Sequence, residues 1–232
     1  MFATIALAAA LTRPLPCAHA LDAPRPAFSH AEQIRTARLI RAVVDATGGS
    51  DTFADVLVLV AQRESSLQPG LVHRLPADTQ GSAAAFRRTR GLYEGNPFAA
   101  DADRWQTYGL FGMNSNYFTQ VWDKTGDPMA LCDAVVDVLV YQRAAGRVLA
   151  KLSKTGACEP TWANVHAAVS SGKLCPPEAR LADFRRRASR AGVDPGQIVT
   201  QAALGRGPSR TEQAAVMQRL RDLVNIGAPA SS

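Results

Sequence analysis

The sequence predicts a single, mostly α domain, and three observations predict it. Apolar residues recur at helical spacing between Asp51 and Pro69. A second apolar stretch, opened by Asp127-Pro128 and continuing to Leu152, is too long for a strand. No segment alternates apolar and polar residues as a half-buried strand does, and we find no internal repeat. The chain of 232 residues is long enough for one sizeable core, with little room for a second full domain.

The first 20 residues have the features of a secretory signal peptide. An apolar run from Phe2 to Leu11 is too short to span a bilayer, and Ala18-His19-Ala20 offers small residues for cleavage. No Lys or Arg precedes the run, so a buried N-terminal helix is the alternative. We expect cleavage after Ala20, a Pro-rich linker over residues 21–28, and a periplasmic or secreted protein.

Two helices are expected next, at the start of a main domain that covers residues 29–192. Ser29 and Glu32 form a capping box for the first helix, which Gly48-Gly49 ends. Asp51 is a good N-cap for the second helix. The apolar stripe of the second helix consists of Phe53, Val56, Leu57, Val60 and Ala61. One more turn along this stripe leads to Glu64.

Glu64 is the first candidate for chemistry. It follows an apolar stripe and lies near the negative end of the helix dipole, and both effects should raise its pKa. A carboxylic acid that stays protonated near neutral pH is a general acid. Ser65, Ser66, Pro69 and Gly70 end the helix, so Glu64 should sit at a mouth of the fold. The alternative is a solvated residue at a fraying helix end.

The rest of the chain alternates irregular and helical stretches. Residues 70–106 lack a clear period, and we interpret residues 75–100 as an irregular insertion after the helix of Glu64. Helices are expected from Asp127-Pro128 to Leu152, from Trp162 to Val169 and around Leu181 to Ala191. The outer face of the last one carries Arg180, Arg185, Arg186, Arg187 and Arg190. Residues 193–226 should form a C-terminal helical extension, and residues 227–232 a disordered tail.

Several kinds of chemistry are not indicated. The histidines are too scattered for a metal site, and we find no phosphate-binding glycine loop, so no metal or cofactor is expected. The net charge of +6 suits an anionic partner. Because aromatic residues do not interleave the basic ones, nucleic-acid binding is not predicted. The run of five arginines is either a solvated face or a surface for an anionic polymer.

Three short segments occur in a telling order. Arg63-Glu64-Ser65 ends a helix, Gly109-Leu110-Phe111-Gly112 follows in a glycine-rich aromatic stretch, and a later helix ends with Ala168-Val169-Ser170-Ser171-Gly172. In this order the chain resembles the lysozyme-like family of soluble lytic transglycosylases and goose-type lysozymes. The resemblance covers roughly residues 51–190. It implies a lysozyme-like domain of packed helices in which Glu64 is catalytic.

The resemblance also implies a substrate groove. Its substrate-binding residues would be Ser65, Tyr108, Gly109, Leu110, Phe111, Asn114 and Ser170. Asp103-Arg104 is similar to an acidic segment of goose-type enzymes, and Asp103 would be a second catalytic carboxylate. The chain departs from the family where Gly112 replaces a glutamine and where Val169 and Ser170 replace a tyrosine and an asparagine. The separation of 45 residues between Glu64 and Gly109 is unusually long.

Three functions follow from the resemblance. The first is a lytic transglycosylase that cleaves between N-acetylmuramic acid and N-acetylglucosamine of peptidoglycan, with Glu64 as acid and then base. The second is a goose-type inverting hydrolase, in which Asp103 positions a water. The third is a non-catalytic wall-binding or assembly protein. In each case the partner would be peptidoglycan, and the protein would be a monomer peripheral to the wall.

Cleavage after Ala20 would leave Cys132, Cys158 and Cys175. If the helices after Pro128 and Pro160 run antiparallel, the lengths of the two helices bring Cys175 near the level of Cys132. We therefore expect a Cys132–Cys175 disulfide, with Cys158–Cys175 as the alternative if the shorter helix frays.

Overall fold

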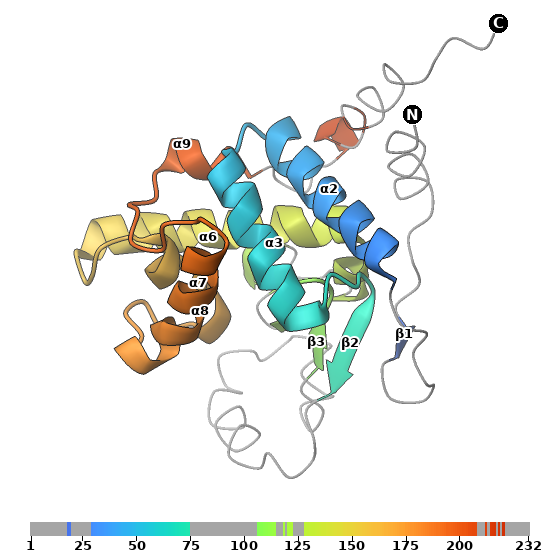
Figure 1. The fold of residues 1–232 in the computed structure, drawn as a ribbon. Coiled ribbons are helices and arrows are strands. Elements are labelled where there is room, and N and C mark those ends of the chain that lie inside the picture. The colour runs from blue at the N-terminus through green and yellow to red at the C-terminus, as the bar shows by residue number, and fades with distance from the viewer. Residues whose placement is uncertain are drawn as a thin grey trace, which may run out of the picture.

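The computed structural model describes residues 18–19, 29–74, 106–114, 118, 120–122, 128–207, 212, 214–216, 218 and 220. These residues form a mostly helical fold, as the sequence predicts, with a small sheet at one end (Figure 1). None of the described helices is long and apolar enough to cross a membrane.

The first two helices, α2 (His30–Ala46) and α3 (Asp51–Ser65), begin with side-chain caps and pack against each other. The predicted capping box is confirmed, since Ser29 and Glu32 each accept a hydrogen bond from the backbone N–H of the other. The N-cap of α3 is Ser50, whose hydroxyl accepts from Phe53 N at 3.2 Å. The prediction of Asp51 as the cap was therefore wrong by one residue, and Asp51 lies in the first turn.

The helix α6 (Ala134–Thr155) is the central element of the fold and is buried along most of its length. It packs on α2 and on α7 (Trp162–Ser171), and Figure 1 shows it crossing behind α3. The prediction of one continuous helix from Asp127-Pro128 was wrong in its first turns. A 3-10 helix, η3 (Pro128–Cys132), precedes α6, because the Asp133 side chain accepts from Val135 N at 2.8 Å and caps a new helix there.

The small sheet was missed by the sequence-based prediction because its strands are too short to show alternation. It contains β1 (Ala18–His19), β2 (Leu71–Arg74), β3 (Gln106–Tyr108) and β4 (Met113–Asn114), in that order. The last three pair antiparallel, with Val72 opposite Tyr108 and Tyr108 opposite Met113. The strand β1 pairs parallel with β2 and lies within the predicted signal peptide. Cleavage after Ala20 remains a prediction.

The C-terminal part of the fold returns to the same core. The helix α8 (Glu178–Arg190) packs on α7 and α3. The segment predicted as a helical extension contains the short helix α9 (Gln201–Leu204). Leu204 is fully buried, and its carbonyl accepts from the Gln142 side chain of α6 at 2.5 Å. Among the described residues, the segment after 192 thus shares the core of the main domain.

The disulfide joins Cys158 to Cys175, so the preferred pairing of Cys132 with Cys175 was wrong and the alternative is observed. The left-handed Gly172 ends α7 and lets the chain turn back, which brings Cys175 to within 6.0 Å (Cα–Cα) of Cys158. Cys132 precedes α6, whereas Cys158 follows it, and a helix of 22 residues is about 33 Å long. Cys132 is itself disulfide-bonded, to a partner outside the described residues.

Candidate active site

Glu64 lies in the last turn of α3, where the helix stops abruptly. Ser66 and Leu67 both adopt left-handed backbone conformations, with φ of 53° and 62°. Such conformations are rare for residues other than glycine. Leu67 N donates to Ala61 O at 3.1 Å, and the Leu67 side chain is buried. This anchored turn fixes the end of α3 and therefore the position of Glu64.

The Glu64 side chain is exposed. The expectation that Glu64 continues the buried apolar stripe of α3 was therefore wrong. The apolar stripe continues from Ala61 to Ser65, four residues on, and not from Val60 to Glu64. Ser65 takes the core position, with its hydroxyl donating to Ala61 O at 2.9 Å. Ser65, expected at the substrate, is therefore buried and hydrogen-bonded to its own helix.

A glycine-rich turn between β3 and β4 lies beside Glu64. Gly109 and Gly112 bound it with φ of 74° and 58°, and Leu110 and Phe111 are buried between them. A Cβ placed on Gly112 would lie 3.7 Å from the Glu64 Oε2 atom. The fold thus brings together two of the predicted segments, which are separated by 48 residues in the chain.

The backbone of the turn is hydrogen-bonded to Asp137 of α6, a residue that was not predicted as part of the site. Its Oδ2 atom accepts from Leu110 N at 2.5 Å and from Phe111 N at 3.3 Å. The carboxylate also lies so close to Gly109 that a side chain there would collide with it and with the Leu131 carbonyl. One buried carboxylate therefore fixes both the hydrogen bonding of this turn and its need for glycine.

Asp137 is fully buried, and its environment changes its acidity. Burial raises the pKa of Asp137 well above its ordinary value, against the two backbone N–H groups that lower it, and nearby Asp133 adds to the rise. The Oδ1 atom has no hydrogen-bond partner among the described residues. The signal for this residue was a lone carboxylate inside the apolar run Ala134–Val140, since such a residue needs a buried partner.

A row of aromatic rings continues from the turn into the core. Phe111 contacts Tyr141 with ring centroids 4.7 Å apart, and Tyr141 Oη is hydrogen-bonded to His166 Nδ1 at 2.8 Å. His166 packs against Phe184 of α8 at 4.7 Å. Burial, followed by the charge of Arg187, lowers the pKa of His166 to about 4, so the imidazole is neutral at pH 7. This row is a packed support for the turn.

The other predicted site residues are placed as follows. Tyr108 is buried and precedes the turn. Asn114 lies in β4 opposite Thr107, and Ser170 is exposed near the end of α7. No hydrogen bond among the described residues joins Ser170 to Glu64. Asp103 and the insertion predicted over residues 75–100 lie outside the described residues.

No group of three or more histidine, cysteine or acidic residues in the described ranges could hold a metal ion. Comparisons with protein-family models, with curated proteins and with solved structures found no match to this chain.

The local geometry defines the class of site. It is an exposed carboxylate at a helix end, beside a glycine turn whose backbone is hydrogen-bonded to a buried aspartate.

Proposed function

We propose that the chain cleaves the β-1,4 bond between N-acetylmuramic acid and N-acetylglucosamine in peptidoglycan, as a lytic transglycosylase. The observation that carries this proposal is the position of the Glu64 carboxylate, exposed at the end of α3 and next to Gly112. Because glycine has no side chain, the space above the carboxylate stays open for a sugar ring. The order of motifs that resembles the lysozyme-like family supports the same assignment.

The mechanism needs one carboxylate that changes role. Glu64 in its acid form donates a proton to the glycosidic oxygen as the bond breaks. The resulting carboxylate then takes the proton of the muramoyl 6-hydroxyl, whose oxygen attacks the anomeric carbon and closes a 1,6-anhydro ring. A sugar bound over the turn also excludes water from the carboxyl group and from the reacting bond. No water is consumed, so no second carboxylate is required.

The surrounding residues support this role by holding the acid in place. The left-handed pair Ser66 and Leu67 fixes the helix end, and Asp137 fixes the turn that faces the carboxylate. A rigid arrangement of this kind keeps the proton donor at a constant distance from a bound substrate. Leu110 and Phe111 are buried, so the backbone of the turn, and not these side chains, faces the sugar.

The first prediction tests the acid directly. Glu64→Gln keeps the shape of the side chain but removes the transferable proton, so cleavage of purified peptidoglycan should fall by about three orders of magnitude or more. Zymography and mass spectrometry of the digest measure this loss. The matched control is Glu159→Gln, another exposed glutamate, at the loop before α7, which should cleave as the parent does.

The products separate the two enzyme mechanisms. A transglycosylase releases 1,6-anhydromuropeptides, which are lighter by one water than the reducing ends that a hydrolase releases. Reducing ends alone would assign a hydrolase, and a loss of cleavage in Asp103→Asn would then assign the positioning of water to Asp103. Equal cleavage by Glu64→Gln and the parent would overturn both mechanisms, and binding without cleavage by the parent would favour the assembly protein.

A further inference from the structure

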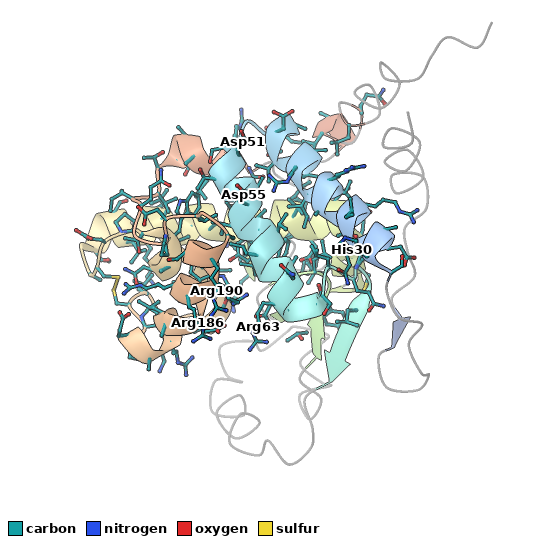
Figure 2. All side chains as sticks on the ribbon, viewed as in Figure 1. His30, Asp51, Asp55, Arg63, Arg186 and Arg190 are labelled. Carbon is teal, nitrogen blue, oxygen red and sulfur yellow. A yellow bond between two sulfur atoms is a disulfide. The ribbon has the colours of Figure 1, made fainter. Side chains whose placement is uncertain are left out.

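A group of arginines lies beside the candidate active site, where α8 meets the end of α3. Figure 2 shows Arg63, Arg186 and Arg190 gathered there. We call Arg63, Arg186, Arg187 and Arg190 the arginine cluster. Three of them surround Asp183, with N–O distances of 3.7 Å to Arg63, 2.5 Å to Arg186 and 3.0 Å to Arg187.

The positive charge of the arginine cluster is only partly neutralised. Asp183 is shared by three guanidinium groups, and Arg190 makes no ion pair among the described residues. Desolvation acts to raise the pKa of Asp183, but Arg187 and Arg186 hold it below its ordinary value, so this residue is ionised at neutral pH. Four arginines and one carboxylate leave a net charge of +3.

The arginine cluster is both anchored and accessible. Arg187 is half-buried, and its Nη1 atom donates to Leu59 O of α3 at 3.2 Å, which ties α8 to α3. The side chains of Arg63 and Arg186 are 60% and 59% exposed, and Arg190 is exposed as well. An anion in solvent can therefore reach these guanidinium groups. The helix α8, which carries three of the four arginines, is held against α3 by the hydrogen bond of Arg187.

The arginine cluster is adjacent to Glu64 through Arg63. Consecutive residues of a helix point about 100° apart. Arg63 pairs with Asp183 of α8, whereas Glu64 lies next to Gly112 of the turn. A ligand that covers Glu64 thus has the arginine cluster along one flank.

We propose that the arginine cluster binds the carboxylates of the peptide stems on the muramoyl residues of peptidoglycan. This inference rests on the proposed function, because the stem is attached to the sugar whose bond would lie at Glu64. Its carboxylates arrive beside the scissile bond, within reach of a neighbouring surface. Guanidinium groups pair with carboxylates through two parallel hydrogen bonds, which fixes orientation as well as charge. The site would thus prefer peptide-bearing strands over bare glycan.

The test compares binding to three insoluble substrates by co-sedimentation. These are intact peptidoglycan, peptidoglycan whose stem carboxylates have been converted to amides with carbodiimide and ammonia, and peptidoglycan freed of phosphodiester-linked polymers by acid. The variant is Arg186→Gln with Arg190→Gln. The matched control, Arg185→Gln with Arg206→Gln, also removes two charges. Arg185 pairs with Glu178 at 2.6 Å on the other flank of α8, and Arg206 pairs with Glu212 at 2.6 Å near the start of α3. Circular dichroism checks that each variant is folded.

The parent should bind intact peptidoglycan about tenfold more tightly than amidated peptidoglycan, and the double variant should lose this preference. Removal of phosphodiester polymers should leave the preference unchanged, and so should the control substitution. Equal binding of the parent to intact and amidated peptidoglycan would overturn the proposal. A preference that disappears only with the phosphodiester polymers would assign the surface to phosphate and also overturn it.

The outcome is independent of catalysis, because binding is measured apart from cleavage. A parent that prefers free over amidated stem carboxylates without cleaving the strands would refute the proposed enzyme and retain the arginine cluster as a stem-binding surface. A parent that cleaves both substrates without any preference in binding would retain the enzyme and refute the role of the cluster.

Discussion

At the scale of single residues, two carboxylates define the candidate site and have opposite environments. Glu64 is exposed and free to meet a substrate, whereas Asp137 is fully buried and hydrogen-bonded to the turn that faces Glu64. A buried carboxylate is unfavourable unless its oxygens are satisfied, and here the two backbone donors to Oδ2 compensate in part. The structure of the turn therefore depends on Asp137.

Asp137→Asn tests this dependence through pH. Because the folded pKa of Asp137 is raised, the folded state binds a proton more tightly than the unfolded chain. The contribution of Asp137 to stability is full below the unfolded pKa of about 4 and is lost as pH rises toward the folded pKa. The asparagine variant lacks this loss, so its stability relative to the parent should increase from pH 4 to pH 7, measured by urea unfolding.

The control for this prediction is Asp137→Val, which removes the acceptor but keeps the site filled. It leaves the buried N–H groups of Leu110 and Phe111 without a partner, so it should be less stable than the asparagine variant by about 2–5 kcal/mol at every pH. An asparagine variant that loses stability relative to the parent as pH rises would contradict the assignment.

At the scale of elements, the turn between β3 and β4 is the structure on which the site depends. Its two glycines are required for different reasons. Gly109 has no room for a side chain because of Asp137 and Leu131, while Gly112 has room but faces Glu64. The absence of a side chain at Gly112 thus leaves the space beside the candidate acid open.

Gly112→Ala should reduce cleavage by about tenfold or more, because the added methyl group occupies the space in which a sugar would contact Glu64. The left-handed φ of 58° should also cost about 1 kcal/mol of stability. Gly156→Ala is the matched control, with φ of 60° and no atom within 4 Å of the added Cβ. Both variants should lose similar stability in thermal unfolding.

Only Gly112→Ala should lose activity in this comparison. Equal activities of the two alanine variants would show that the space beside Glu64 is not used by the substrate. A loss of activity in both would indicate that destabilisation alone explains the effect.

At the scale of the whole molecule, the helical core and one disulfide hold the parts together. The Cys158–Cys175 bridge closes a segment that contains all of α7, the helix that packs on α6 and α8. Phe53 of α3 stacks on Trp162 at the start of α7, with ring centroids 5.7 Å apart. The position of α7 therefore links the helix of Glu64 to the C-terminal half of the core.

Replacing both Cys158 and Cys175 by serine should lower the free energy of unfolding by about 3 kcal/mol, as expected for a closed segment with a sequence separation of 17 residues. Denaturant unfolding measures the change, and peptide mapping without reductant checks the pairing in the parent. A mapped Cys132–Cys175 peptide would contradict the structure.

Sequence patterns alone determined the helical nature of the fold, the capping box of α2 and the approximate limits of most helices. These features depend on residues within a few positions of each other, through apolar periodicity and hydrogen bonds of the caps. They also indicated Glu64 and the glycine turn as candidates, although their functional roles remain proposals.

Only the tertiary structure decided which residues meet. It placed Ser65 rather than Glu64 in the core, put Gly112 beside the carboxylate and paired Cys158 with Cys175. It also revealed Asp137 under the turn and the shared ion pairs of Asp183. Each of these contacts joins different elements or depends on how a helix is rotated against its neighbours. Helical periodicity specifies a face only to within about one residue, or 100°, and that interval separates a buried side chain from an exposed one.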